Sequence, residues 1–253
     1  MTERLLIDAL DRLAERGSTV DFWLRDDDCI EPTVALETLL AATHRHAIPL
    51  TLAVIPAFTG VPLAARLEGE DNVLVAVHGW SHENHAPQGV KKRELGADRP
   101  LAIVEDELRQ GLALLSRLHP ARFLPMLVPP WNRIDPAVIE RLSSLGYRSL
   151  STFGPAGLAP RSDGLRLLNT HVDVIDWHGT RGGRDADSLF AETAALCHAG
   201  SVVGLLTHHL VHDAMVTDFL ERLFMLTAGH PGCRWRSAAD ILSSPTLPAD
   251  QKA

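Results

Sequence analysis

Short apolar runs alternate along the chain with longer stretches in which apolar residues recur every three or four positions. The short runs are rich in Val, Leu and Ile and do not alternate with polar residues, which is typical of strands buried on both faces. This order predicts an α/β fold in which crossover helices join the strands of a parallel sheet. The seven predicted strands span Val20–Leu24, Pro49–Ile55, Asn72–Val77, Arg122–Val128, Tyr147–Thr152, Asn169–Ile175 and Ser201–Leu206.

The helical stretches between these runs begin and end at recognisable residues. Pro32-Thr33 and Pro100 precede two of them, and Asp135-Pro136 resembles an N-cap followed by proline at the first helical position. Gly146 follows the last residue of that third helix, where a glycine is a common stop signal. Two further helical patterns cover Asp185–Ala199 and Asp213–Ala228.

Composition and charge limit the class of protein. The chain has 45% hydrophobic and 22% charged residues, which excludes intrinsic disorder, and no apolar run approaches the roughly 18 residues of a membrane span. A net charge of −8 disfavours nucleic acid and anionic membranes as partners. No linker or repeat divides the sequence, so residues 1–253 are predicted to form a single domain, with a frayed tail over about 244–253.

Cysteine usage and the N-terminus predict a cytoplasmic protein. Cys29, Cys197 and Cys233 are odd in number and widely spaced, so they do not form a disulfide framework. The first residues form an amphipathic pattern with acidic positions inside it, unlike the charged and apolar regions of a signal peptide.

Polar residues follow five of the seven predicted strands. The carboxyl ends of parallel strands meet at one edge of a sheet or barrel, and ligands bind there in α/β proteins. The sequence therefore predicts a functional site at this edge. The five segments are Arg25–Cys29, His78–His85, Pro129–Arg133, Asp176–His178 and Thr207–His209.

Three consecutive aspartates and a spaced pair of histidines are typical of a metal site. Asp26, Asp27 and Asp28 repel one another near a buried strand end, so a cation is expected there, although an Asx turn or helix N-cap also explains adjacent aspartates. His78 and His82 are four residues apart, so on a turn of helix or a tight loop both imidazoles project to the same side. Two His and one Asp leave metal positions open for water and substrate.

Further residues of these segments suit proton transfer. A second Asp beside the ligand Asp can accept a proton from water, and a separate His can protonate a leaving group while another Asp holds it in place. The sequence offers Asp27, His208 and Asp176 for these three roles.

The ordered set of five motifs resembles the NodB-homology polysaccharide deacetylase superfamily, related to carbohydrate esterase family 4. The motifs are Asp27-Asp28, His78-x-x-x-His82, Pro129-Pro130-Trp131, Asp173-x-x-Asp176-Trp177 and Leu206-x-His208. The resemblance covers most of the chain and implies an irregular (β/α)₇ barrel, similar to a TIM barrel. It identifies the chain as a divergent, intracellular member of the superfamily.

The resemblance implies roles for individual residues. It makes Asp27 the catalytic base, His208 the acid and Asp176 the residue that tunes His208. The metal ligands would be Asp28, His78 and His82, and the ion most in keeping with them is Zn²⁺. If the register shifts by one residue, Asp26 becomes the base and Asp27 the ligand. The implied substrate-binding residues are Arg25, Pro130, Trp131, Asn132 and Trp177.

Two positions depart from the superfamily pattern. Members commonly carry an arginine before the Pro-Pro of the third motif, where it pairs with the catalytic Asp, but here Val128 precedes Pro129. Arg25 or Arg133 is expected to replace that charge, with Arg25 slightly preferred. Cys29 stands where a glycine normally follows the Asp pair, and we expect a buried, inert thiol rather than a metal ligand.

Taken together, the motifs predict a metal-dependent hydrolase that removes an N-acetyl or related acyl group from an amino sugar or glycan. Two alternatives remain open, namely an amidase for a small non-sugar amide and a barrel that binds metal or sugar without turnover. The expected partner is a small-molecule or glycan substrate, and the sequence leaves the oligomeric state open.

Overall fold

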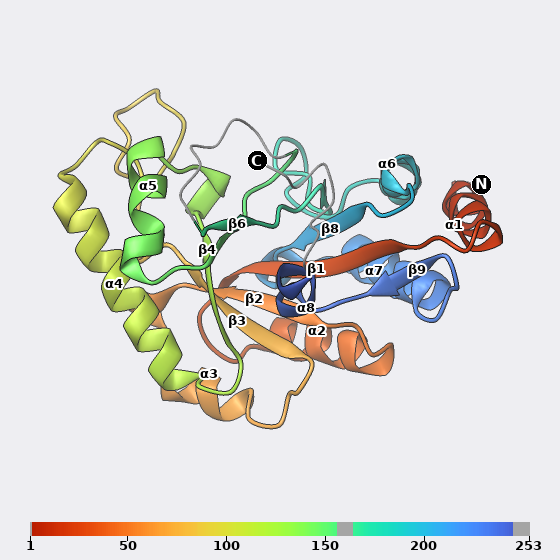
Figure 1. Ribbon diagram of the computed structural model, residues 1–253, viewed down its shortest axis with the longest axis horizontal. Coiled ribbons are helices and arrows are strands. Elements are labelled where there is room, and N and C mark those ends of the chain that lie inside the picture. Colours follow the sequence, from red (N-terminus) through yellow and green to blue (C-terminus); the bar gives the residue numbers. More distant parts are fainter. Residues whose placement is uncertain (1, 156–163, 245–253) are drawn as a thin grey trace.

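The computed structural model describes residues 2–155 and 164–244, which form a curled parallel sheet with helices around it (Figure 1). The nine-stranded sheet has the order β6-β5-β4-β3-β2-β1-β8-β7, and β9 pairs with the start of β1. Every ladder between these strands is parallel. The strands are β1 (Val20–Cys29), β2 (Leu50–Val54), β3 (Val73–His78), β4 (Phe123–Val128), β5 (Ser149–Leu150), β6 (Arg166–Leu167), β7 (Val172–Asp173), β8 (Val202–Thr207) and β9 (Cys233–Trp235).

Helices connect most successive strands, as the alternating pattern predicts, whereas β6 leads into β7 without one. Thr33 accepts a hydrogen bond from the Leu36 N–H at the start of α2, and Asp135 accepts one from the Ala137 N–H at the start of α5. Gly146 ends α5 with a φ of 104°, a left-handed conformation that glycine adopts without strain. The helices are α1 (Glu3–Glu15), α2 (Val34–Arg45), α3 (Val61–Arg66), α4 (Leu101–Leu118), α5 (Pro136–Leu145), α6 (Ala186–Leu196), α7 (Ala214–Thr227) and α8 (Ala238–Ser243), with 3₁₀ turns η1 (Pro56–Phe58), η2 (Pro130–Asn132) and η3 (His209–Val211).

The predicted α/β barrel architecture is confirmed, with one extension and two additions. Each of the seven predicted strands overlaps an observed one, and the two-residue β6 and the three-residue β9 are additional. The first strand is longer than expected, because β1 continues through Arg25–Cys29, which the sequence predicts as a segment after the strand. The predicted frayed tail lies almost wholly in residues 245–253, outside the described residues.

The two faces of β1 have different surroundings. Phe22 and Leu24 belong to the large core between the sheet and the surrounding helices. Trp23 points to the opposite face, where it packs in a smaller cluster that includes Ile241 of α8. Because side chains alternate along a strand, Asp26 shares the helix-covered face with Leu24, and Arg25 shares the inner face with Trp23.

Asp26 is buried on the helix-covered face and paired with His209. Its carboxylate accepts hydrogen bonds from the backbone N–H of His209 (2.7 Å) and from the Nδ1 of the same residue (2.5 Å). The side chains are 0% and 1% exposed, respectively. Burial lowers the pKa of His209, but the adjacent Asp26 charge outweighs burial and raises it. The pair therefore neutralises one charge of the aspartate run and fixes η3 to β1.

We expect Asp26→Ala to destabilise the protein by about 3–5 kcal/mol, because it leaves His209 buried without its partner. The measurement is urea unfolding of the parent, Asp26→Ala, His209→Ala and the double variant. The double variant should lose less free energy of unfolding than the sum of the two single variants. Additive losses would show that the two side chains do not stabilise each other.

No helix among the residues described here is long and apolar enough to cross a membrane.

Candidate metal centre and catalytic site

A bulge at the end of β1 turns Asp28 toward β3. The register against β2 shifts between Asp26 and Cys29, which face Leu52 and Val54, so β1 contains one residue more than β2 in this stretch. Asp28 itself has a φ of 66°, a left-handed conformation that is uncommon outside glycine. The bulge and this conformation bring the Asp28 carboxylate to the carboxyl end of β3.

His78 and His82 meet Asp28 there. The Asp28 Oδ1 lies 3.1 Å from the Nε2 of His78 and 3.2 Å from the Nε2 of His82. One ligand atom from each of the three residues lies within 4.8 Å of the others. The Nδ1 of His78 donates a hydrogen bond to the Val128 carbonyl (2.9 Å), which leaves its Nε2 directed at Asp28.

The electrostatics of this triad favour a cation. Burial alone would raise the pKa of Asp28, but the hydrogen bond with His78 and the charges of both histidines outweigh it and hold that pKa well below its usual range. Burial lowers the pKa of His78, yet the charge of Asp27 and the contact with Asp28 raise it overall. Burial and the charge of His78 lower the pKa of His82. The negative charges of Asp27 and Asp28 therefore favour a positive charge at this position, which a metal ion would supply.

The loop between the two histidines is held by Glu94, a residue that the sequence patterns did not single out. Its buried carboxylate accepts hydrogen bonds from the backbone N–H groups of Trp80 (3.2 Å) and Ser81 (2.7 Å). Gly79 is left-handed at φ 59°, and a Cβ on it would collide with the Glu94 carboxylate and the Pro130 ring. The loop therefore has one compact path, and that path sets the distance between His78 and His82.

Arg25 holds Asp27 on the inner face of β1. The Arg25 Nε lies 2.9 Å from Oδ1 of Asp27 as an ion-pair contact, and the guanidinium donates a hydrogen bond to Oδ2 at 3.0 Å. The same guanidinium donates to the Ser151 Oγ and the Asn132 Oδ1, both at 2.7 Å. Arg25 is 0% exposed. Of the two arginines considered in the sequence, Arg25 is therefore the one that pairs with Asp27, whereas Arg133 donates to the Lys92 carbonyl.

His208 lies at the end of β8, the neighbour of β1. Asp26 pairs in register with Thr207, so His208 lies level with Asp27. The edge of its ring packs against Trp177, with centroids 4.7 Å apart. Its Nδ1 is buried and has no hydrogen-bond partner among the described residues.

The structure does not bring Asp176 to His208. The Asp176 carboxylate accepts hydrogen bonds from the N–H groups of Gly179 and Thr180 in an exposed loop, which lowers its pKa. Asp173, the first aspartate of the same motif, lies close enough to His208 for their charges to interact. Burial raises the pKa of Asp173, and its carboxylate accepts a hydrogen bond from the Trp177 indole (2.8 Å). Asp173 therefore holds Trp177, the residue whose ring packs against His208.

The other predicted residues occupy different positions around the triad. The Trp131 ring lies 4.3 Å from the His82 ring, and Trp177 is 39% exposed. Pro130 is buried, and the Asn132 side chain accepts from Arg25. Cys29 is buried outside the triad, and burial raises the pKa of its thiol well above the ordinary value.

Backbone strain is concentrated at this site. Six non-glycine residues of the described chain have positive φ, and four of them are Asp28, His82, Trp131 and Asn132. Each such conformation costs on the order of 1–3 kcal/mol and persists only where surrounding contacts enforce it. The contacts that hold these conformations are therefore concentrated at Asp28, His82 and the Trp131 turn.

Comparison with solved structures shows the same fold. A protein from Mycobacterium smegmatis described as a polysaccharide deacetylase has 15% identity, with 89% of this chain and 90% of that chain covered and a TM-score of 0.64. A family 4 acetyl xylan esterase from Clostridium thermocellum, in complex with a cobalt ion, has 14% identity, coverage of 91% and 94%, and a TM-score of 0.58. A mutant of a family 4 pseudoenzyme has 15% identity, coverage of 89% and 68%, and a TM-score of 0.61.

No family model matches the sequence, and no curated protein does. At these identities the likeness is one of fold alone.

We expect Glu94→Ala to weaken metal binding by about ten- to a hundredfold, because residues that orient metal ligands commonly have effects of this size. Isothermal titration calorimetry with Zn²⁺ measures the change, and Glu94→Gln, which keeps one carbonyl acceptor, should lie between the parent and the alanine variant. Glu83→Ala removes an exposed carboxylate from the same loop and is the matched control. Equal affinities for the parent and Glu94→Ala would contradict the role of Glu94.

Proposed function

We propose that the protein is a metal-dependent hydrolase that removes an N-acetyl or related acyl group from an amino sugar or glycan. The observation that carries this proposal is the convergence of Asp28, His78 and His82 beside the Asp27–Arg25 pair at the carboxyl ends of parallel strands. Such edges are where α/β barrels bind and convert their substrates.

The residues of the triad fit a divalent metal ion. Nitrogen and oxygen ligand atoms about 3 Å apart agree with metal bonds of about 2.1 Å. His78 is already held in one orientation by the Val128 carbonyl, as metal-binding histidines commonly are. Asp28, His78 and His82 would therefore hold the ion, and Zn²⁺ is our first choice for it. When bound, such an ion polarises an acyl carbonyl and makes water more acidic.

Asp27 and His208 are proposed to move the protons. Asp27 lies next to the triad in the chain, and Arg25 fixes both of its oxygens, so its carboxylate is positioned to accept a proton from attacking water. His208 lies level with Asp27 on the neighbouring strand and is positioned to protonate the departing amine. Asp173, which lies in β7 beside β8 and accepts a hydrogen bond from the Trp177 indole, is proposed to position His208. The Arg25 guanidinium is buried and bound to Asp27, so we assign it to positioning the base and not to contacting substrate.

Two aromatic side chains support a sugar as the substrate. Trp131 lies against His82 and Trp177 lies against His208, so the ligand His82 and the proposed acid His208 each have an indole beside them. Flat apolar surfaces of this kind suit the apolar faces of pyranose rings. A barrel that binds its ligand without turnover is the second candidate, because one structural neighbour is a pseudoenzyme.

We expect acetate release to require both the bound metal ion and the three residues of the triad. Chelation should abolish acetate release from N-acetylated amino sugars, and Zn²⁺ should restore it. Asp28→Ala and His82→Ala should lose metal and activity, whereas Asp27→Asn should keep the metal and lower kcat by about 10²–10⁴-fold. The control is Glu68→Ala, which removes an exposed carboxylate that precedes the amino end of β3. Metal content and acetate release are measured on the same preparations, and full activity of Asp28→Ala would contradict the proposal.

We expect substitutions of Asp173 and Asp176, the two aspartates of the fourth motif, to have different effects on kcat. Asp173→Asn should lower kcat, because it removes the charge that acts on His208, and it should shift the limb of the pH–kcat profile that reports the acid. Asp176→Asn should have a smaller effect, because that carboxylate only caps the exposed loop. The measurement is kcat against pH for the parent and both variants. The reverse order of effects would restore Asp176 to the role that the motif predicts.

A further inference from the structure

The distribution of lysine in this chain is unusual. Of the 24 basic residues, 21 are arginine and only Lys91, Lys92 and Lys252 are lysine. Two of the three are therefore adjacent, although the chain as a whole has a net charge of −8. Lys252 lies outside the described residues.

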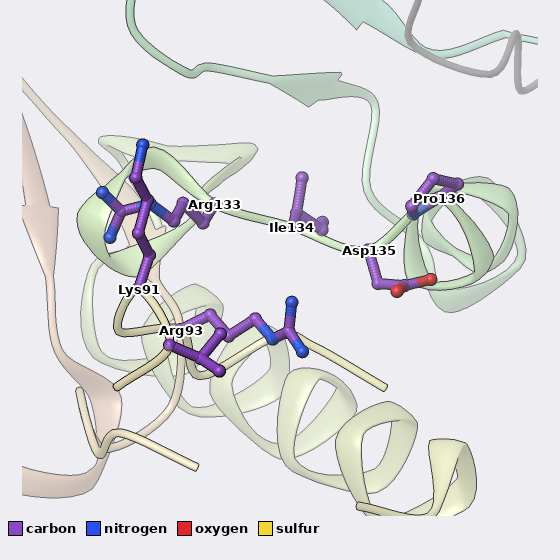
Figure 2. A pocket seen from close by; sticks show the side chains of 7 residues that line it. Lys91, Arg93, Arg133, Ile134, Asp135 and Pro136 are labelled. Atoms are coloured by element: carbon purple, nitrogen blue, oxygen red, sulfur yellow. The ribbon is translucent and has the colours of Figure 1, made fainter. Parts of the chain in front are cut away.

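Lys91 and Lys92 lie in the loop after β3, where it packs against the segment after β4. Leu95 and Ile134 form a parallel bridge between the two segments, and Arg133 donates a hydrogen bond to the Lys92 carbonyl (2.8 Å). The segments enclose a pocket of about 400 Å³, which Figure 2 shows with Lys91, Arg93 and Arg133 among its lining residues. Val90, Ile134, Asp135 and Pro136 complete the lining.

The positive charges of this pocket are mostly uncompensated. Arg93 is neutralised by Asp98, with contacts of 2.5 and 2.8 Å. In contrast, Lys91 and Arg133 of the lining, and Lys92 beside it in the loop, form no ion pair with an acidic side chain in the described part of the protein. Asp135 is the one acidic residue in the lining. Three cations without an acidic partner, on two segments that contact each other, attract an anion to this part of an acidic protein.

This group is one indole away from the metal centre. The Lys92 ammonium lies over the Trp131 ring, 5.9 Å from its centroid, and the Trp131 ring lies 4.3 Å from the ring of His82. The cation–π contact with Trp131 explains the position of Lys92 only. Lys91 and Arg133 make no such contact in the described part of the protein. A molecule whose acyl group lies at the triad can therefore extend across Trp131 to these cations.

We propose that Lys91, Lys92 and Arg133 bind a negatively charged group of the substrate, a phosphate or a carboxylate, while its acyl group lies at the metal centre. The inference rests on the proposed function for the position of the acyl group, but the anion site itself stands on the charges and contacts of the pocket. Lysine provides a compact ammonium that pairs with either anion. The substrate class is thus an acylated amino sugar that carries phosphate or carboxylate, and not a neutral polymer.

Binding to the metal-free full chain tests the site without any turnover. Isothermal titration calorimetry is carried out with N-acetylglucosamine 1-phosphate, N-acetylmuramic acid and N-acetylglucosamine, which share an acetamido sugar and differ in charge. At least one of the two anionic sugars should bind about tenfold more tightly than the neutral one. The sugar with the larger gain identifies phosphate or carboxylate as the recognised group.

Substitutions then assign the effect to the pocket. Lys91→Gln/Lys92→Gln should remove most of the preference for the anionic sugar and leave the affinity for the neutral sugar within about twofold, whereas Lys91→Arg/Lys92→Arg should retain the preference. Arg12→Gln/Arg16→Gln removes the same charge from exposed positions at the end of α1, next to the opposite end of β1, and should change nothing.

Equal affinities for charged and neutral sugars would overturn the proposal. An equal loss of the charge preference in Lys91→Gln/Lys92→Gln and in either of the other two double variants would also overturn it. An enzyme that releases no acetate but keeps the charge preference would overturn the proposed function and leave the anion site standing.

Discussion

The charged run from Arg25 to Asp28 lies at the carboxyl end of β1, between β2 and β8, and each charge there needs a partner that the fold must supply. Unpaired ions in such an interior are strongly destabilising. Asp26 has His209, Asp27 has Arg25, and Asp28 has His78 and His82. These partners come from η3, from β1 itself and from β3, so the end of β1 joins several elements that are distant in the sequence.

The alternation of side chains along β1 separates stabilisation from chemistry. Asp26 faces the helices and is closed off from solvent, whereas Asp27 faces the interior beside Arg25. The bulge that follows then turns Asp28 out of the alternation and toward the histidines. Three identical residues in a row thus obtain three environments, and only the last two contribute to the site. The buried carboxylate of Glu94 completes the arrangement, because it fixes the loop that carries His82.

Local signals in the sequence predicted the strands, the caps of α2 and α5 and the convergence of the strand ends, because hydrophobic period and capping are encoded by nearby residues. The length of β1 was not predictable, because the contact that buries Asp26 comes from His209, 183 positions along the chain. Glu94 was equally hidden, since an isolated glutamate in a polar loop resembles a solvated one. Asp173 could have been preferred over Asp176, because it lies in a short strand beside β8, whereas Gly179 and the residues after it predict an exposed loop.

The proposed function requires one ion bound by one carboxylate and two imidazoles, with the contact between Arg25 and Asp27 retained. A crystal structure of the Zn²⁺-loaded protein, with anomalous data at the zinc edge, tests it most directly. We predict one strong anomalous peak in contact with Asp28, His78 and His82, an unchanged contact between Arg25 and Asp27, and a Cys29 sulfur that does not touch the ion. A peak in contact with Cys29 or Asp26, or the absence of a peak at the triad, would contradict the proposed metal site.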